Sequence, residues 1–548
     1  MKRLLFVVCI LIIARQTAAQ DLICLTWEAG TSEKTIYVRA TTDTENISVN
    51  WGDGIIENFD VGGMPHYSIN LSHSYERSGT YNVIVTTSDA NFKLTYLSCN
   101  WGQLTRLDVS AATALTTLHC SNNQLTSLDL SANAVLQDLF CPNNQLTSLD
   151  LSANTSLTHL DCYSNQLTSL DVSANTSLTS LDCGNNQLRN LDVSSNTSLT
   201  LLDCTYNRLT SLNVSGATAL TNLWCISNQL ASLNLITNTK LVQLDCSYNQ
   251  LTNLNLNVNT ELRYLTCKSN QLTSLNLIAN TKLNQLNCSS NQLINLNINA
   301  NTVLTTLYCE NNQLVNLNVS THTTLRSLVC HSNKLTSLNV SADTALTYLL
   351  CYDNSLPLSD LYAASMLISD DDTKRFGTQT HDLQSVVLAT PYSLAGEMNF
   401  NGIQTEFSVR KNDAAAVENE DYSIDYSVET ISFLTSGSYK VTMTNSAITS
   451  LLSYSAQVIM NFEVNTSGID HIKNNNIFIY PNPTSDLLNI NLENHFEPVQ
   501  VQIFNTQAQI SYEQTVQGGS VQTISIANLS KGIYFMKIGN KHIKLIIQ

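Results

Sequence analysis

The sequence is poor in charge, and above all in positive charge. Its 548 residues include 26 Lys and Arg against 43 Asp and Glu, so the net charge is −17, and only 13% of the residues are charged. The shortage of basic residues argues against nucleic acid as the main partner, because phosphate binding needs a cationic surface. Since 43% of the residues are hydrophobic, the low charge also excludes a disordered chain.

Long apolar runs are scarce as well. Residues 1–19 carry Lys2 and Arg3, then an apolar stretch from Leu4 to Ile13, then small residues up to Ala19, which is the pattern of a secretory signal peptide. No later stretch reaches the roughly 18 continuous apolar residues of a membrane helix. We therefore expect an exported protein with no transmembrane segment.

Motifs of common catalytic and metal sites are absent. The sequence has no HExxH, GxSxG, P-loop or GxGxxG motif. It also has no CxxC motif and no clustered histidines that would hold a metal. We predict a protein that is not an enzyme, with no catalytic residue, no metal and no cofactor.

Proline is rare, with 7 residues, but cysteine is abundant, with 15. Thirteen cysteines, from Cys99 to Cys351, follow one another at intervals of 21 residues. In stacked coils their side chains would lie about 4.8 Å apart, which is longer than the roughly 3.8 Å between the Cβ atoms of a disulfide. We therefore predict a column of buried thiols. Cys24 lies outside this ladder and is not assigned.

The cysteines belong to a repeated unit, L-x-x-L-x-C-x-x-N-x-L followed by L-[DN]-[LV]-S-x-N-T. Residues 94–356 resemble the leucine-rich repeat family, with cysteine in place of the third leucine. The resemblance implies a solenoid of stacked coils that share one core. A unit of 21 residues leaves little chain for a convex helix, so we expect short strands or 3₁₀ turns there. The recurrent asparagine is expected to satisfy backbone groups where the chain leaves the strand.

The segments that flank the repeats alternate apolar and polar residues. Residues 20–93 contain Trp51-Gly52-Asp53-Gly54 and His73-Ser74-Tyr75 and look like the PKD family, a β-sandwich of surface and secreted proteins. We interpret Asp53 and His73 as structural. Residues 357–380 show helical spacing and are expected to cap the solenoid. Residues 381–464 are predicted to form an immunoglobulin-like β-domain, and residues 465–476 a linker. The predicted fold class is mainly β: a solenoid flanked by β-sandwich domains.

Residues 477–548 carry three motifs that are similar to the C-terminal sorting domain of type IX secretion in Bacteroidetes-type bacteria. The resemblance implies export through the periplasm and outer membrane by the type IX secretion machinery, followed by release or attachment to the cell surface. The matching residues are Tyr480, Pro481, Asn482, Pro483, Lys531, Gly532 and Tyr534.

The concave face of the solenoid is the candidate binding surface. The positions one and three before each cysteine and one after it should face solvent there. Like charges stacked at strand spacing repel one another, so the consecutive aspartates before the cysteines suggest a site for a basic peptide, a cation or a sugar, with aromatics as contact area. The alternative is a solvated strip that keeps the protein soluble. The candidate residues are Phe140, Asp161, Tyr163, Asp182, Asp203, Trp224, Asp245 and Tyr264.

These observations predict an exported interaction or adhesion protein whose repeats bind a protein ligand. One alternative is a glycan-binding accessory protein of the cell envelope. A second alternative is a secreted enzyme with an unrecognised site in residues 381–464.

Overall fold

A computed structural model describes residues 23–30, 33–40, 46–60, 69–87, 93–465, 478–480, 487–491, 498–507, 509–517, 521–538 and 541–547. The predicted signal peptide, the linker after Asn465, and Pro481, Asn482 and Pro483 of the sorting motif lie outside these residues. The described chain is mainly β, as predicted, and divides into two units, Met1–Cys351 and Tyr352–Gln548.

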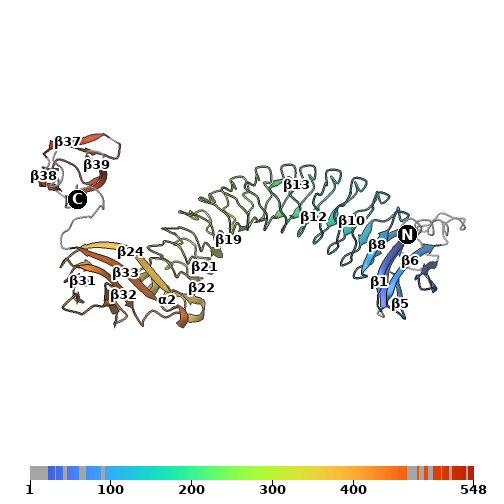
Figure 1. Ribbon diagram of the computed structural model, residues 1–548, viewed down its shortest axis with the longest axis horizontal. Coiled ribbons are helices and arrows are strands. Elements are labelled where there is room, and N and C mark those ends of the chain that lie inside the picture. Colours follow the sequence, from blue (N-terminus) through green and yellow to red (C-terminus); the bar gives the residue numbers. More distant parts are fainter. Residues whose placement is uncertain are drawn as a thin grey trace. The chain divides into compact units, whose positions relative to one another are not determined.

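The repeats form a solenoid in which each coil adds one short strand to a parallel sheet. The strands pair in register. Figure 1 shows the coils stacked in an arc, with β10 (Asp138–Phe140) and β12 (Ser180–Asp182) on its inner side and β13 (Asn190–Asp192) on its outer side. The inner strands are β9 (Thr117–His119), β10 (Asp138–Phe140), β11 (His159–Asp161), β12 (Ser180–Asp182), β14 (Leu201–Asp203), β16 (Asn222–Trp224), β17 (Gln243–Asp245), β18 (Tyr264–Thr266), β19 (Gln285–Asn287), β20 (Thr306–Tyr308), β21 (Ser327–Val329) and β22 (Tyr348–Leu350).

The repeated leucines and cysteines form the core. In β12, for example, Leu181 is fully buried between two half-buried residues, and Cys183 is buried just after the strand. Leucines of the outer side, such as Leu191, fill the coil from the opposite wall. Because each coil is too thin to bury these side chains alone, the coils are stable only when stacked.

A ladder of asparagines three residues after the cysteines holds neighbouring coils together. The side-chain Oδ1 of Asn144 accepts a hydrogen bond from the Leu125 N–H at 3.1 Å. Its Nδ2 donates to the carbonyls of Cys120 and Cys141, at 2.9 and 3.1 Å. This confirms the predicted role of the recurrent asparagine, since the bonds lie where the chain leaves the strand.

A second asparagine ladder, thirteen residues after the cysteines, joins the coils on the opposite side. Nδ2 of Asn154 donates to the carbonyls of Leu130 and Asn133, at 3.0 and 2.9 Å. The other asparagines of this ladder are Asn133, Asn175, Asn196, Asn238, Asn259, Asn280 and Asn301. In four coils the position is occupied instead by Ala112, Ala217, His322 and Asp343.

The convex side has no helix between residues 93 and 351. It consists of turns, with two short paired strands, β13 (Asn190–Asp192) and β15 (Ser211–Asn213). The aspartates and asparagines nine residues after the cysteines each accept a bond from the N–H two residues on, as Asp150 does from Ser152 at 3.0 Å. These Asx turns give the second acidic column, which runs along this side, a structural role.

The ladder cysteines from Cys99 to Cys309 are buried free thiols, as predicted. Several of them donate weakly to a carbonyl of the next coil; Cys183 Sγ lies 3.5 Å from the Asp203 oxygen. Burial raises the pKa of Cys99 to about 12 and raises the pKa of Cys183 well above its usual value. A thiol that stays protonated is a poor nucleophile, so these cysteines act as small core residues.

The N-terminal segment is a β-sandwich whose two sheets each pair with a strand of the first coil. Strand β2 (Glu33–Ala40) pairs with β7 (Leu94–Ser98), and β1 (Ile23–Ala29) pairs with β8 (Leu104–Asp108), both antiparallel. The first coil therefore does not end in an open sheet edge. The remaining strands are β3 (Asn46–Asn50), β4 (Ile56–Asp60), β5 (Ile69–Ser74) and β6 (Gly79–Thr87).

The core of this sandwich contains Trp51, His73 and Tyr75 from the two motifs that the sequence singled out. His73 Nε2 lies 2.8 Å from Asp53 Oδ2, and the His73 ring stacks on Trp51 with 5.0 Å between centroids. The Tyr75 hydroxyl donates to the Trp51 carbonyl at 2.9 Å. His73 is itself buried, so the pair ties a turn to the core.

The second unit contains helix α2 (Leu358–Leu367), within the predicted helical segment, and a two-layered β-domain. Ring contacts join the layers: Tyr392 and Phe433 of one sheet lie 4.9 Å from Phe462 of the other. The elements are η1 (Asp371–Thr373), β23 (Lys374–Arg375), β24 (Thr378–Val387), β25 (Tyr392–Ser393), β26 (Asn399–Phe400), β27 (Ile403–Gln404), β28 (Glu406–Lys411), β29 (Ala414–Ala415), β30 (Tyr422–Asp425), β31 (Thr430–Phe433), β32 (Gly437–Thr444), η2 (Leu452–Tyr454) and β33 (Gln457–Asn465).

The C-terminal strands form two antiparallel sheets around an aliphatic core that includes Val501, Ile503 and Met536. One sheet has the order β34-β35-β38 and the other β37-β36-β39-β40. The strands are β34 (Phe478–Tyr480), β35 (Leu487–Asn491), β36 (Val499–Phe504), β37 (Ile510–Val516), β38 (Val521–Ser525), β39 (Gly532–Ile538) and β40 (Lys541–Ile547).

Candidate binding surface on the concave face

The predicted site residues lie on the solvent side of the inner sheet. Each three-residue strand places its central leucine in the core and its two outer residues on the concave face. Asp161, Asp182, Asp203, Trp224 and Asp245 are adjacent in the same register and all are half-buried. Phe140 is half-buried in this column, and Tyr163 and Tyr264 are exposed in the flanking columns. Gly184 leaves room for the Tyr163 ring, because a Cβ there would lie 3.0 Å from Tyr163 Cδ2.

The aspartates of this column also shape the backbone. Oδ1 of Asp182 accepts a hydrogen bond from the Gly184 N–H at 3.0 Å, and Oδ1 of Asp203 accepts one from Thr205 at 2.9 Å. The asparagine at the same position in a later coil, Asn287, makes the same bond to the Ser289 N–H at 3.1 Å. An Asx turn therefore needs a side-chain oxygen here but does not need a negative charge.

Burial disfavours the negative charge of these aspartates. Burial raises the pKa of Asp182 to about 6, with a smaller contribution from the charges of Asp203 and Asp161. Burial, with a further contribution from Asp203, likewise raises the pKa of Asp161 and of Asp245. The column is thus a strip of negative potential in which a bound cation would be favoured.

We expect Asp182→Asn to stabilise the protein at pH 7.5 by about 1 kcal/mol, after allowance for solvent screening of a half-buried group. The pKa of Asp182 is about 6 in the folded protein and 3.8 in the unfolded chain. The wild type therefore has its full stability with respect to this group below pH 3.8 and loses part of it as the pH rises through 6. The gain should therefore vanish at pH 4 when melting is followed by calorimetry. Asp129→Asn on the convex side is the control, because hydrogen bonds from Ser131 lower the pKa of Asp129. An equal gain at both pH values would contradict this account.

One column of the site was missed by the sequence interpretation. The residue two after each ladder cysteine has a positive φ, and in three coils it is a large aromatic: Trp101, Tyr206 and Tyr248, with φ of 58°, 52° and 55°. These side chains are 74%, 58% and 50% exposed. Most other coils have asparagine or serine at this position, as is usual for a turn. The tyrosines that replace them were the sequence signal that could have identified this column.

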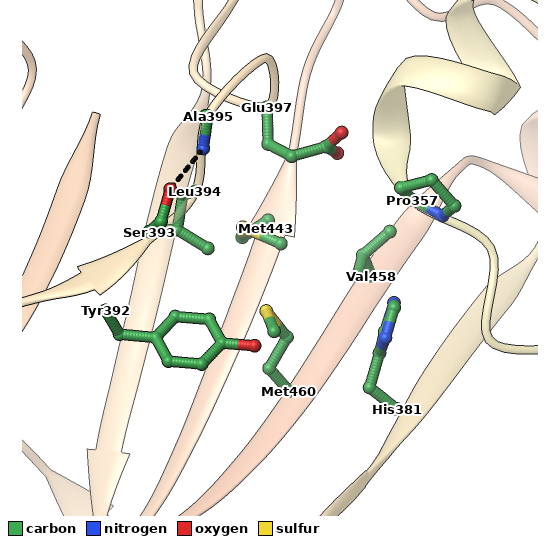
Figure 2. Close-up of a pocket in the computed structure, with 10 residues that line it drawn as sticks. All are labelled: Pro357, His381, Tyr392, Ser393, Leu394, Ala395, Glu397, Met443, Val458 and Met460. Carbon is green, nitrogen blue, oxygen red and sulfur yellow. Dashed lines mark hydrogen bonds between the residues drawn. The ribbon is translucent and has the colours of Figure 1, made fainter. Parts of the chain in front are cut away.

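The β-domain of the second unit contains a separate cavity of about 190 Å³ (Figure 2). His381, Tyr392 and Glu397 are among its lining residues. Glu397 accepts a hydrogen bond from the Ser359 N–H at 3.2 Å, and its carboxylate is turned toward helix α2 in Figure 2. Burial lowers the pKa of His381 and raises the pKa of Glu397. The Glu397 carboxylate is thus hydrogen-bonded to the first turn of the helix. Among the described residues, no hydrogen bond links this carboxylate to His381.

The described part of the sorting motif lies in the C-terminal sheets. Tyr480 ends β34, and Lys531 and Gly532 come at the start of β39. Tyr534 is buried in the core, and its hydroxyl lies 3.0 Å from Ser530 Oγ. Residues 478–548 match the family described as the secretion system C-terminal sorting domain. The chain carries a type IX sorting domain. The protein is therefore secreted or attached to the cell surface, and no helix of the described residues is long and apolar enough to cross a membrane.

Other similarities are more distant. An ulvan lyase from Nonlabens ulvanivorans is 26% identical over 147 residues, which are 26% of this chain and 26% of that protein, so the chain matches about a quarter of its relative. The functional domain of InlJ from Listeria monocytogenes, which includes a cysteine ladder, is 27% identical over 68% of this chain and 90% of that one, with a TM-score of 0.49. A leucine-rich-repeat protein of Leptospira interrogans is 26% identical over 48% and 72% of the chains, with a TM-score of 0.45.

Proposed function

We propose that the protein is an exported interaction or adhesion protein whose solenoid binds a protein ligand on its concave face. The observation that carries this proposal is the half-buried aspartate column, in which burial raises the pKa of Asp161, Asp182 and Asp245. A surface that served only solubility would keep its carboxylates hydrated and at their usual pKa. The PKD-like and immunoglobulin-like domains would act as spacers, residues 357–380 as a cap, and the sorting domain as the export signal.

The test is a binding survey with the full chain and a concave-face variant. The variant combines Asp161→Asn, Asp182→Asn, Asp203→Asn and Trp224→Ala, and the survey combines pull-down of surface proteins with a glycan array. We expect protein ligands captured by the wild type to be lost by the variant, because asparagine keeps the Asx turns and removes the charge. Unchanged binding in every assay would refute the concave-face proposal.

A glycan-binding accessory protein is the second candidate. The exposed rings of Tyr206 and Tyr248 favour it, since sugars stack on such rings, and the partial similarity to an ulvan lyase points to polysaccharide-rich surroundings. The glycan array separates this candidate from the first. An enzyme with its site in residues 381–464 is the third candidate, and it would use the cavity lined by His381 and Glu397.

A further inference from the structure

Trp224 lies between two aspartates on the concave face. Strand β16 pairs in register with β14 on one side and β17 on the other, so Asp203 and Asp245 flank Trp224 in one column. Each neighbour is one strand spacing away, about 4.8 Å. All three side chains are half-buried, so the indole offers a partly dehydrated surface between two carboxylates.

The polar groups around the indole are acceptors that a ligand can still use. Oδ1 of Asp203 binds the Thr205 N–H at 2.9 Å, and Oδ1 of Asp245 binds the Ser247 N–H at 3.0 Å. In both turns Oδ2 is the oxygen that a ligand would contact. Thr205, on the same face, is 8% exposed, and its hydroxyl has no hydrogen-bond partner among the described residues. This hydroxyl is buried in the free protein, so the Thr205 side chain must turn toward a ligand, and it gains free energy when the ligand then accepts or donates a hydrogen bond.

Two exposed tyrosines lie in the coils next to that of Trp224. Tyr206 and Tyr248 occupy the coils before and after Trp224, and both hold the left-handed conformation described above. A cation already approaches one of these rings, because Lys268 Nζ lies 5.8 Å from the Tyr248 centroid. These tyrosines add exposed aromatic surface to the two coils that flank the coil of Trp224.

We propose that Trp224, Asp203, Asp245 and Thr205 form a seat for an arginine side chain of a basic protein partner. The proposal rests on the proposed function of the concave face and names the chemistry of its ligand. A guanidinium stacks on an aromatic face and offers five N–H donors with no acceptor. The seat supplies the complement: an indole face, two carboxylates and a hydroxyl. A lysine ammonium would satisfy the charge but could not stack as a plane.

The experiment titrates the full chain carrying Trp101→Phe with hexa-arginine and hexa-lysine peptides, with hexa-glutamate as a negative probe. Trp27 and Trp51 are 0% exposed, so Trp224 is then the tryptophan whose fluorescence reports binding. We expect hexa-arginine to shift this fluorescence and to bind at least tenfold more tightly than hexa-lysine. The double variant Asp203→Asn with Asp245→Asn should lower the affinity for hexa-arginine at least tenfold. The variant Trp224→Leu should do the same, and its binding is measured by calorimetry because the reporting tryptophan is gone.

The matched control is Asp129→Asn with Asp150→Asn, which removes the same charge from the convex side and should leave binding unchanged. The seat is refuted if its variants bind hexa-arginine as the wild type does. If that binding is lost instead in Asp161→Asn with Asp182→Asn, the seat is wrong while the concave face still binds a basic ligand. If the wild type binds no hexa-arginine, the seat is also wrong, and the pull-down then decides the proposed function independently.

Discussion

Replacing Asn144 by alanine is expected to destabilise the solenoid by roughly 4 kcal/mol. The substitution leaves the Leu125 N–H without its partner in a buried place. The carbonyls of Cys120 and Cys141 each lose one hydrogen bond and keep another, from Asn123 and Asn165. A buried group without a partner costs about 1–3 kcal/mol, and each of the two lost bonds costs about 1 kcal/mol more. Urea unfolding measures the loss, and hydrogen exchange should show the Leu125 amide opening first, since each coil is stabilised by its direct neighbours.

Gln145→Ala is the control for this prediction. Gln145 is the exposed neighbour of Asn144, and its backbone N–H, which bonds to the Leu125 carbonyl at 2.8 Å, is kept by alanine. Its effect should stay within about 0.5 kcal/mol. If the two variants unfolded alike, the asparagine ladder would not be what holds adjacent coils together.

The repeat frame allowed most of the solenoid to be predicted from the sequence. The leucine and cysteine two residues apart fix a strand with one buried face, and the period of 21 fixes the register, because each copy must align with the next. The asparagine three residues after the cysteine was interpreted correctly for the same reason. Its amide recurs where every coil leaves the strand. At that place a backbone N–H and a backbone carbonyl need a side-chain partner.

The site could be predicted only as a set of columns. Asp182 and Asp203 each accept a hydrogen bond from the N–H two residues later in the chain. These bonds depend on backbone angles, which the residue type at a repeated position does not reveal. The left-handed conformation of Tyr206 was hidden too, because tyrosine rarely adopts it. Likewise, the pairing of β2 with β7 joins segments about 60 residues apart, and no local pattern indicates it.

The second asparagine ladder leads to the other large prediction, at the coil where aspartate interrupts it. Asp343 is 0% exposed, and neither of its carboxylate oxygens has a hydrogen-bond partner among the described residues. Burial raises the pKa of Asp343 to about 7. His322, one coil earlier, keeps the ladder by a different group, since its Nε2 lies 3.1 Å from the Ile298 carbonyl. Asp343 in its ionised form has no proton to donate to a carbonyl.

We expect Asp343→Asn to stabilise the last coils by up to about 4 kcal/mol at pH 9 and by much less at pH 5. The folded pKa lies above the unfolded 3.8, so the stability of the wild type is complete below pH 3.8 and is lost as the pH rises through about 7. Asparagine removes this loss, and its Nδ2 would donate to the Val319 and His322 carbonyls at the sequence separations that Asn154 keeps. Urea unfolding and hydrogen exchange of residues 330–351 at both pH values measure the difference.

The reciprocal variant, Asn301→Asp, is the matched control for the Asp343 prediction. Asn301 is also 0% exposed, and its Nδ2 donates to the Leu277 and Asn280 carbonyls at 3.2 and 2.8 Å. Aspartate there should lose both bonds and should make that coil lose stability between pH 5 and pH 9. If the wild type is as stable at pH 9 as at pH 5, then ionisation of Asp343 does not destabilise the folded state. If Asn301→Asp is neutral, the ladder tolerates a carboxylate and the proposed cause of the pH dependence is wrong.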